Sequence, residues 1–275
     1  MTIASRISAS PLAACPFRHV VVDDCLSPEE LAAIHAHWPG PDRFHDGGIR
    51  GNFVFDLARG GELGDPDREF WAGFWEDIAA QITDALAERY LDVMTAKFGK
   101  TVPLAPTIIL QEMGPTFAGH EVHNHHWHSP NWVFTSILYV DHFDDAPGTT
   151  LYGLNGNSDL RRMAEIAALT LQWEDMEDII PVATIPCRPN RLLSFIDSPI
   201  SYHGVEPPRS AIAARGRRMI RMHVSAPGET IQEIYGVLQA QYQVHRRRAS
   251  RKPFVIDWLQ KEIAQLQACG AVPGV

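Results

Sequence analysis

Eight short β-rich segments follow one another between residues 107 and 225, and they constrain the fold more than any other feature of the sequence. Each segment is rich in apolar or β-branched residues and is bounded by Gly, Pro or Asp. Short strands at this spacing are typical of an antiparallel sandwich or barrel. We therefore predict a two-sheet jelly roll with strands at 107–113, 120–128, 133–141, 149–153, 182–187, 191–197, 201–205 and 217–225.

Helices are predicted on both sides of this β-rich region. Ser27, Pro28 and Glu30 form a helix start, and apolar residues recur every four positions from Phe70 to Tyr90. Segments 229–244 and 254–268 return to helical spacing and are expected to pack outside the barrel. The Gly-rich segment 44–65 is read as a mobile loop that covers a site.

We interpret residues 1–275 as one domain that is mainly β with flanking helices. Residues 1–106 supply an N-terminal strand and helices, 107–225 the jelly-roll core, and 226–275 the C-terminal helices. The C-terminal helices offer a surface for a possible homodimer.

Charge and composition exclude several classes of protein. The formal net charge of -9 argues against nucleic-acid binding, which needs a surplus of Lys and Arg. No apolar run is long enough for a signal peptide or a membrane span, so we expect a cytoplasmic protein without a membrane partner.

The four cysteines are scattered and are expected to be reduced thiols. No nucleophile elbow or phosphate-binding glycine loop is present, which argues against hydrolases and dehydrogenases.

The most distinctive chemical feature is a cluster of histidines. Five of the thirteen histidines lie between Gly119 and Ser129, and another, His203, lies far downstream. Imidazole is the commonest protein ligand of first-row transition metals. If residues 120–128 form a strand, one face presents His120, His126 and His128, and the other presents His123 and His125. The pattern predicts a metal centre that combines part of this cluster with His203.

Four motifs, in this order, resemble those of the iron(II)- and 2-oxoglutarate-dependent oxygenases, and most closely the prolyl-hydroxylase-like branch. They are the segment 126–140, which begins His-Trp-His, then Gly-Thr-Thr-Leu-Tyr at 148–152, Pro-Asn-Arg-Leu-Leu-Ser-Phe at 189–195 and His-Gly-Val at 203–205. The opening segment 16–27 is also similar, so the resemblance covers most of residues 16–225. It implies a double-stranded β-helix core of the cupin type.

The resemblance implies metal ligands at His126, His128 and His203. His126 matches the first ligand of the family and His203 the distal one, whereas His128 stands where the family has Asp or Glu. His128 then completes a three-histidine site, hydrogen-bonds a metal-bound water, or marks an inactive site. A His123-x-His125 pair is a competing register. Imidazole ligands also suit zinc, copper and nickel.

The resemblance also implies an arginine that holds the distal carboxylate of 2-oxoglutarate. Arg217 and Arg221 share a strand face and are the predicted co-substrate residues, whereas Arg218 faces the other way. The alternative is an arginine-rich edge strand that only keeps the sheet soluble. Tyr139 is a weaker candidate for the same role.

The implied function is that of a non-haem iron(II)- and 2-oxoglutarate-dependent oxygenase that uses O2. The expected reaction is oxidation, most simply hydroxylation, of an aliphatic C–H in a small-molecule or amino-acid-derived substrate. The alternative function is that of a three-histidine metalloprotein without 2-oxoglutarate, either a cofactor-independent dioxygenase or a metal-binding scaffold.

Overall fold

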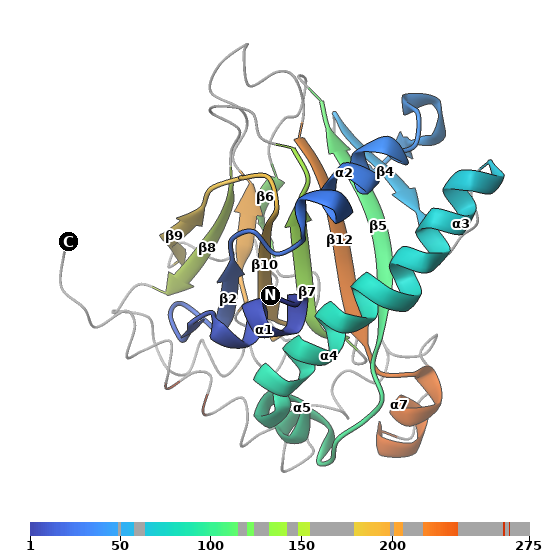
Figure 1. The fold of residues 1–275 in the computed structure, drawn as a ribbon. Helices are drawn as coiled ribbons and strands as arrows, with labels where there is room; N and C mark the ends of the chain where they lie inside the picture. The colour runs from blue at the N-terminus through green and yellow to red at the C-terminus, as the bar shows by residue number, and fades with distance from the viewer. Residues whose placement is uncertain are drawn as a thin grey trace.

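Two antiparallel sheets form the centre of the structure. This computed structural model describes residues 1–48, 51–57, 64–114, 120–123, 132–141, 148–154, 179–198, 201–205 and 217–235, with 261 and 264. The larger sheet has the order β1-β2-β10-β7-β12-β5-β4-β3, and the smaller sheet has the order β6-β11-β8-β9 (Figure 1). The predicted jelly roll is therefore confirmed.

The described strands between residues 105 and 225 lie close to their predicted positions, whereas β1, β3 and β4 were not predicted. The larger sheet contains β1 (Leu12–Ala13), β2 (His19–Val22), β3 (His45–Asp46), β4 (Asn52–Asp56), β5 (Ala105–Met113), β7 (Trp132–Tyr139), β10 (Arg191–Ile196) and β12 (Arg217–Ser225). The smaller sheet contains β6 (His120–His123), β8 (Thr149–Leu154), β9 (Ile179–Ile185) and β11 (His203–Val205).

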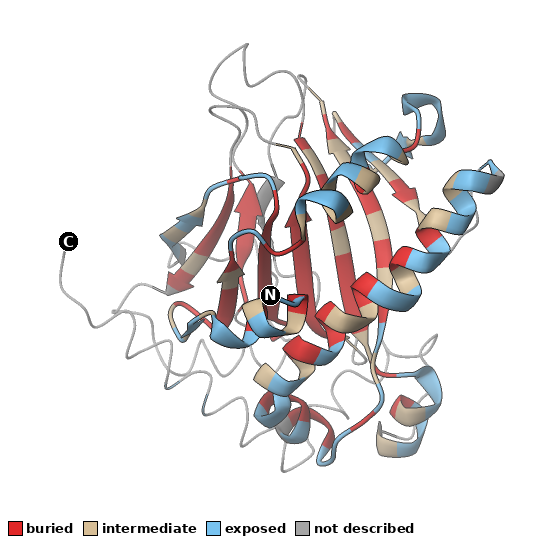
Figure 2. Cartoon of the chain, viewed as in Figure 1, coloured by how far each residue is buried: buried red, intermediate tan, exposed pale blue. Residues whose placement is uncertain are grey.

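Helices cover the outer face of the larger sheet (Figures 1 and 2). They are α1 (Ile3–Ala9), α2 (Pro28–Ala36), α3 (Asp65–Gly73), a π-helical segment (Phe74–Ala79), α4 (Ala80–Arg89) and α5 (Leu91–Phe98). The predicted start of α2 is confirmed, because Ser27 and Glu30 form a reciprocal capping box. The helical spacing from Phe70 to Tyr90 allows one long helix or two joined helices, and the structure has a junction at Tyr90, between α4 and α5. The Tyr90 hydroxyl donates to the Ser194 carbonyl.

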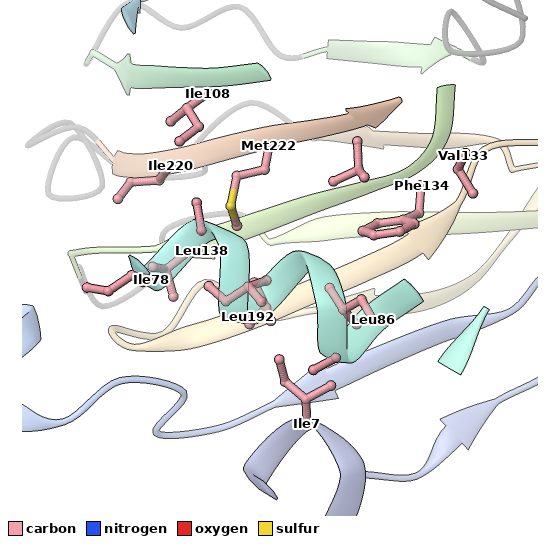
Figure 3. Packing of buried hydrophobic residues seen from close by; sticks show 14 of the residues in the cluster. Ile7, Ile78, Leu86, Ile108, Val133, Phe134, Leu138, Leu192, Ile220 and Met222 are labelled. Carbon is pink, nitrogen blue, oxygen red and sulfur yellow. The ribbon is translucent and has the colours of Figure 1, made fainter. Parts of the chain in front are cut away.

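The main hydrophobic core lies between these helices and the sheet. Ile78 and Leu86 from the helices pack with Leu138, Ile220 and Met222 from the sheet (Figure 3). Each of these side chains is at most 8% exposed. Full burial of one such side chain contributes roughly 1.5–3 kcal/mol, so this layer fixes the sheet on which the interior side chains stand.

A second, smaller core lies on the other face of the larger sheet, inside the jelly roll. Its members include Tyr139, Phe195, Met219 and Leu151, which come from both sheets. Because side chains alternate along a strand, Ile220 and Met222 of β12 face the helices while Met219 faces this interior. Arg217 and Arg221 have the same parity as Met219 and therefore share the interior face.

Two motif residues have structural roles. A Cβ at Gly148 would lie 1.8 Å from the Ile185 carbonyl oxygen, so only glycine permits this approach between β8 and β9. Asn190 has a φ of 59°, and its side chain accepts from the Leu26 amide at 2.7 Å and donates to the Leu26 carbonyl at 2.8 Å. The Asn190 contacts join the N-terminal segment to the start of β10.

Several expectations are corrected or lie outside the described residues. The Gly-rich segment is not simply a loop, because β3 and β4 form an antiparallel pair within it and β4 pairs with β5. Cys25 and Cys187 are free, but Cys15 is disulfide-bonded, contrary to the expectation of reduced thiols. The described start of the first C-terminal helix is α7 (Gly228–Tyr235), whereas the rest of that helix and nearly all of the predicted helix 254–268 lie outside the described residues.

Within the described ranges, no helix has the length and apolarity needed to cross a membrane.

Candidate metal centre

His203 begins β11 and has the surroundings expected of a metal ligand. The side chain is 6% exposed, and its Nδ1 lies 2.8 Å from the Ser201 carbonyl oxygen. A carbonyl only accepts hydrogen bonds, so the imidazole proton is on Nδ1 and the lone pair is on Nε2. Metal-binding histidines are oriented in this way, with the second nitrogen donating to a backbone carbonyl.

A second buried histidine, His223, lies in the same neighbourhood. The register aligns Phe195 with Thr135 and Thr135 with His223, and the Phe195 ring lies 4.6 Å from the His203 ring. The Nδ1 of His223 is 3.1 Å from the Thr135 hydroxyl, and its ring stacks on Trp132 at 4.5 Å. Burial lowers the pKa of His223, and Arg221 and His203 lower it further, so His223 is neutral at pH 7.

The histidine cluster is described only at its N-terminal end. His126 and His128 lie outside the described residues, so their predicted role as ligands stays a prediction. The backbone of β6 is described, and it places His123 directly opposite His203 in the antiparallel pairing with β11. Residues directly opposite each other in such a pair share one face of the sheet. The described ranges contain no complete group of three potential metal ligands.

Arg217 lies in the interior at the first residue of β12. Its side chain is 3% exposed, and the guanidinium carbon lies 5.4 Å from the centre of the Tyr139 ring. The Tyr139 hydroxyl is 2.7 Å from the Thr149 hydroxyl, which comes from the smaller sheet. Guanidinium and two hydroxyl groups therefore gather at this end of the interior, where they form a polar set suited to a carboxylate.

Arg221 lies on the same face of β12, two residues before His223. Its Nε is buried and has no hydrogen-bond partner. Burial lowers the pKa of Arg221 to about 10, which still leaves the guanidinium charged at pH 7. Arg218 differs, because its Nε lies 3.0 Å from a Glu112 carboxylate oxygen and 3.5 Å from one of Asp141. The predicted division of the three arginines between two faces is thus confirmed, and their roles stay predictions.

Sequence reasoning missed two features of this interior. His223 carries no motif and was not predicted to be near His203, and Thr149 was seen only as part of a motif. Strand parity alone places His223 on the same face of β12 as Arg221, so the buried position of His223 could have been predicted from the sequence. The pairing of Thr149 with Tyr139 depends on contact between the two sheets, which no local pattern reports.

A buried acid lies at the same end of the sheet as Trp132. Asp197 follows β10, is fully buried, and neither of its carboxylate oxygens has a hydrogen-bond partner. Burial raises the pKa of Asp197 to about 7, while the charge of Lys97 opposes this shift. The Lys97 ammonium is also buried and donates to the Trp132 carbonyl.

No family model matches the sequence, and no curated protein matches it. A Pseudomonas putida prolyl-4-hydroxylase superposes with a TM-score of 0.51 at 12% identity, covering 82% of this chain and 100% of that one. A non-heme alpha-ketoglutarate-dependent carbocyclase from nogalamycin biosynthesis has a TM-score of 0.51 at 11% identity, covering 86% of this chain and 90% of that one.

The chain has the jelly-roll fold of these oxygenases. A weaker neighbour, from Streptomyces hygroscopicus, was solved with nickel and 2-oxoglutarate bound and has a TM-score of 0.44 at 10% identity, covering 76% of this chain and 82% of that one. At such identities the comparisons show the fold, and the chemistry has to be argued from the residues.

Proposed function

We propose that this chain is a non-haem iron(II)- and 2-oxoglutarate-dependent oxygenase that oxidises an aliphatic C–H of a small molecule. The observation that carries the proposal is the arrangement of the jelly-roll interior. His203 presents a lone pair on Nε2, and two cations face the same interior, namely the buried Arg217 and the half-buried Arg221, whose Nε is buried. A divalent metal and a dicarboxylate are the ligands that such a set suits.

We propose that three histidines hold the metal, namely His203 and a His-x-His pair from the cluster. The sequence interpretation takes His126 with His128. The register of β6 favours His123 with His125, because His123 is directly opposite His203 on the neighbouring strand. Metal–nitrogen bonds are only about 2 Å long, so ligands have to converge from adjacent positions.

The co-substrate proposal assigns the distal carboxylate of 2-oxoglutarate to Arg217. The guanidinium lies over the Tyr139 ring, and the Tyr139 hydroxyl is within hydrogen-bond distance of the Thr149 hydroxyl. Burial strengthens an ion pair of this kind, since little water competes for the carboxylate. The apolar residues of the smaller core, Met219 and Leu151 among them, exclude water from the space between the arginine and the metal end.

When bound, iron(II), 2-oxoglutarate and O2 supply the oxidising chemistry. The residues of the chain bind and orient these groups. His203 holds its proton on Nδ1 through Ser201, which leaves the lone pair on Nε2. The neutral His223, stacked on Trp132, adds no positive charge beside the metal.

The test is succinate formation from 2-oxoglutarate by the purified protein with Fe(II) in air. The proposal predicts that succinate forms only when Fe(II) and 2-oxoglutarate are both present. Arg217→Met is expected to weaken 2-oxoglutarate binding at least about 30-fold, since it removes one partner of a buried charge pair. Arg218→Met, on the opposite face, is the matched control and should leave the reaction unchanged.

Metal binding that is indifferent to 2-oxoglutarate, with no succinate formed, would contradict the proposal. That result would support the alternative of a three-histidine metalloprotein that does not use this co-substrate.

A further inference from the structure

We infer that Arg221 binds an anionic group of the primary substrate, so that the substrates of this protein are small carboxylic acids. The inference rests on the proposed function and adds the class of substrate to it. The inference rests on the position of Arg221, on its lack of a hydrogen-bond partner, and on the positive charge of the interior.

Arg221 and Arg217 stand at different levels of the interior. Four residues separate them on β12, which corresponds to roughly 13 Å along a strand. Arg217 precedes Met219, which pairs with Tyr139, whereas Arg221 pairs with Ile137 and is two residues from His223. Arg221 is thus at the His203 end of the interior, where the proposed metal would be held, and Arg217 is at the far end. The two arginines are therefore placed to hold two different anionic groups.

The lack of a partner separates Arg221 from the other arginines whose Nε is buried and unpaired. Arg18 binds Asp92 through Nη1, and Arg89 donates to the carbonyls of Ser8 and Ser10. Arg217 donates through Nη2 to the Met219 sulfur at 3.6 Å. Among the described residues, no hydrogen bond or ion pair is made by Arg221. The Arg221 side chain is half-buried, and a buried Nε without an acceptor is costly for a folded protein unless a ligand supplies that acceptor.

The positive charge of the interior also favours an acidic substrate. Histidine ligands are neutral, so a metal held by three of them keeps both of its positive charges. Arg217 and Arg221 add one positive charge each, and 2-oxoglutarate, a dianion, offsets only half of the total. Asp197 is a buried acid at the metal end, but burial favours its protonated form and Lys97 lies near it. The loaded site thus has a positive surplus that an acidic substrate would offset, and a bidentate carboxylate fits a guanidinium.

The experiment uses the full chain loaded anaerobically with Fe(II) and 2-oxoglutarate. The probes are acetate, isobutyrate and benzoate, each compared at matched ionic strength with its neutral amide. Binding is read from the melting temperature and from the change in the visible charge-transfer band of the metal–co-substrate complex. The variants are Arg221→Met, Arg221→Lys and the surface control Arg218→Met.

We expect at least one carboxylate, and none of the amides, to raise the melting temperature of the wild type and of Arg218→Met. Arg221→Met should lose this response while its 2-oxoglutarate affinity stays within about threefold of the wild type, and Arg221→Lys should keep part of it. Arg221→Met should also fold without ligands and melt no lower than the wild type, because the substitution removes a buried Nε that has no acceptor.

A carboxylate response that persists in Arg221→Met, or that is absent from the wild type, would overturn the inference. A tenfold loss of 2-oxoglutarate affinity in Arg221→Met would also overturn it and would assign Arg221 to the co-substrate. Failure of the proposed function looks different, because the wild type itself would then show no charge-transfer band with 2-oxoglutarate.

Discussion

Single residues in the jelly-roll interior differ mainly in which polar groups they already contact. His203 donates through Nδ1 to Ser201, and His223 is 3.1 Å from Thr135 and stacks on Trp132. The first contact orients a metal ligand, and the second keeps a neutral imidazole beside it. Proximity to the metal end alone therefore does not make a histidine a ligand, and each candidate has to be tested by substitution.

The two histidine registers predict opposite results for one pair of variants. If His123 is a ligand, as its position opposite His203 suggests, His123→Ala should weaken Fe(II) binding by more than about 100-fold, and His126→Ala should change it little. Anaerobic competition with a chelator measures both affinities, and exposed His45→Ala is the control. Strong loss in His126→Ala with normal binding in His123→Ala would instead support the register of His126 with His128.

Asp197 predicts a pH dependence of stability. Burial raises its pKa to about 7, so the folded chain keeps this proton at pH values where the unfolded chain has released it. The contribution of Asp197 to the free energy of unfolding is therefore greatest below about pH 4 and is lost as the pH rises towards 7. Asp197→Asn should gain stability relative to the wild type between pH 4.5 and 7.5, as measured by urea denaturation without metal. An equal difference at both pH values would contradict the prediction.

Residue-scale prediction from the sequence succeeded where strand parity was sufficient. Parity placed Arg217 and Arg221 on one face of β12 and Arg218 on the other, as the structure has them. It was insufficient for Thr149, because the contact of Thr149 with Tyr139 joins strands of two different sheets. Parity also failed to choose between the histidine registers, because that choice depends on which residue of β6 lies opposite His203.

At the scale of elements, local signals predicted helix starts and strand positions well, and they failed for the Gly-rich segment. The capping box of Ser27 and Glu30 is local, and α2 begins where it predicts. In the segment 44–65, the glycines indicated a loop, but Asn52–Asp56 pairs with β5 along its whole length. β4 forms because it pairs with β5, and this tertiary contact outweighs the local loop signal of the glycines. Because part of segment 44–65 belongs to the sheet, the prediction of a mobile loop that covers a site is weaker than the glycine content suggested.

The junction of β8 and β9 gives a prediction about stability. Gly148→Ala should lower the free energy of unfolding by about 2–4 kcal/mol, because its Cβ would overlap the Ile185 carbonyl oxygen at 1.8 Å. Gly73→Ala is the matched control, since that residue is helical and a Cβ there meets nothing within 4 Å. The control should gain about 0.5–1 kcal/mol. Urea denaturation of both variants checks the pair, and a neutral Gly148→Ala would show that the strands separate readily.

At the scale of the whole molecule, the net charge does not reveal how charge is divided between the surface and the interior. The chain has a net charge of -9, yet its jelly-roll interior carries the cations Arg217 and Arg221. The order of motifs predicted the two-sheet fold, because each motif ends or begins a strand. The substrate was not predictable, because the interior charge depends on which face of each strand is buried.

The central claim is that this interior binds a metal and 2-oxoglutarate together, and one titration tests it most directly. Apo-protein is titrated anaerobically with Fe(II) and then with 2-oxoglutarate, while the visible charge-transfer band is recorded. We predict a band in the wild type, no band in His203→Ala, and a band that needs at least about 30-fold more 2-oxoglutarate in Arg217→Met. A wild type that binds Fe(II) and shows no band at any 2-oxoglutarate concentration would contradict the account.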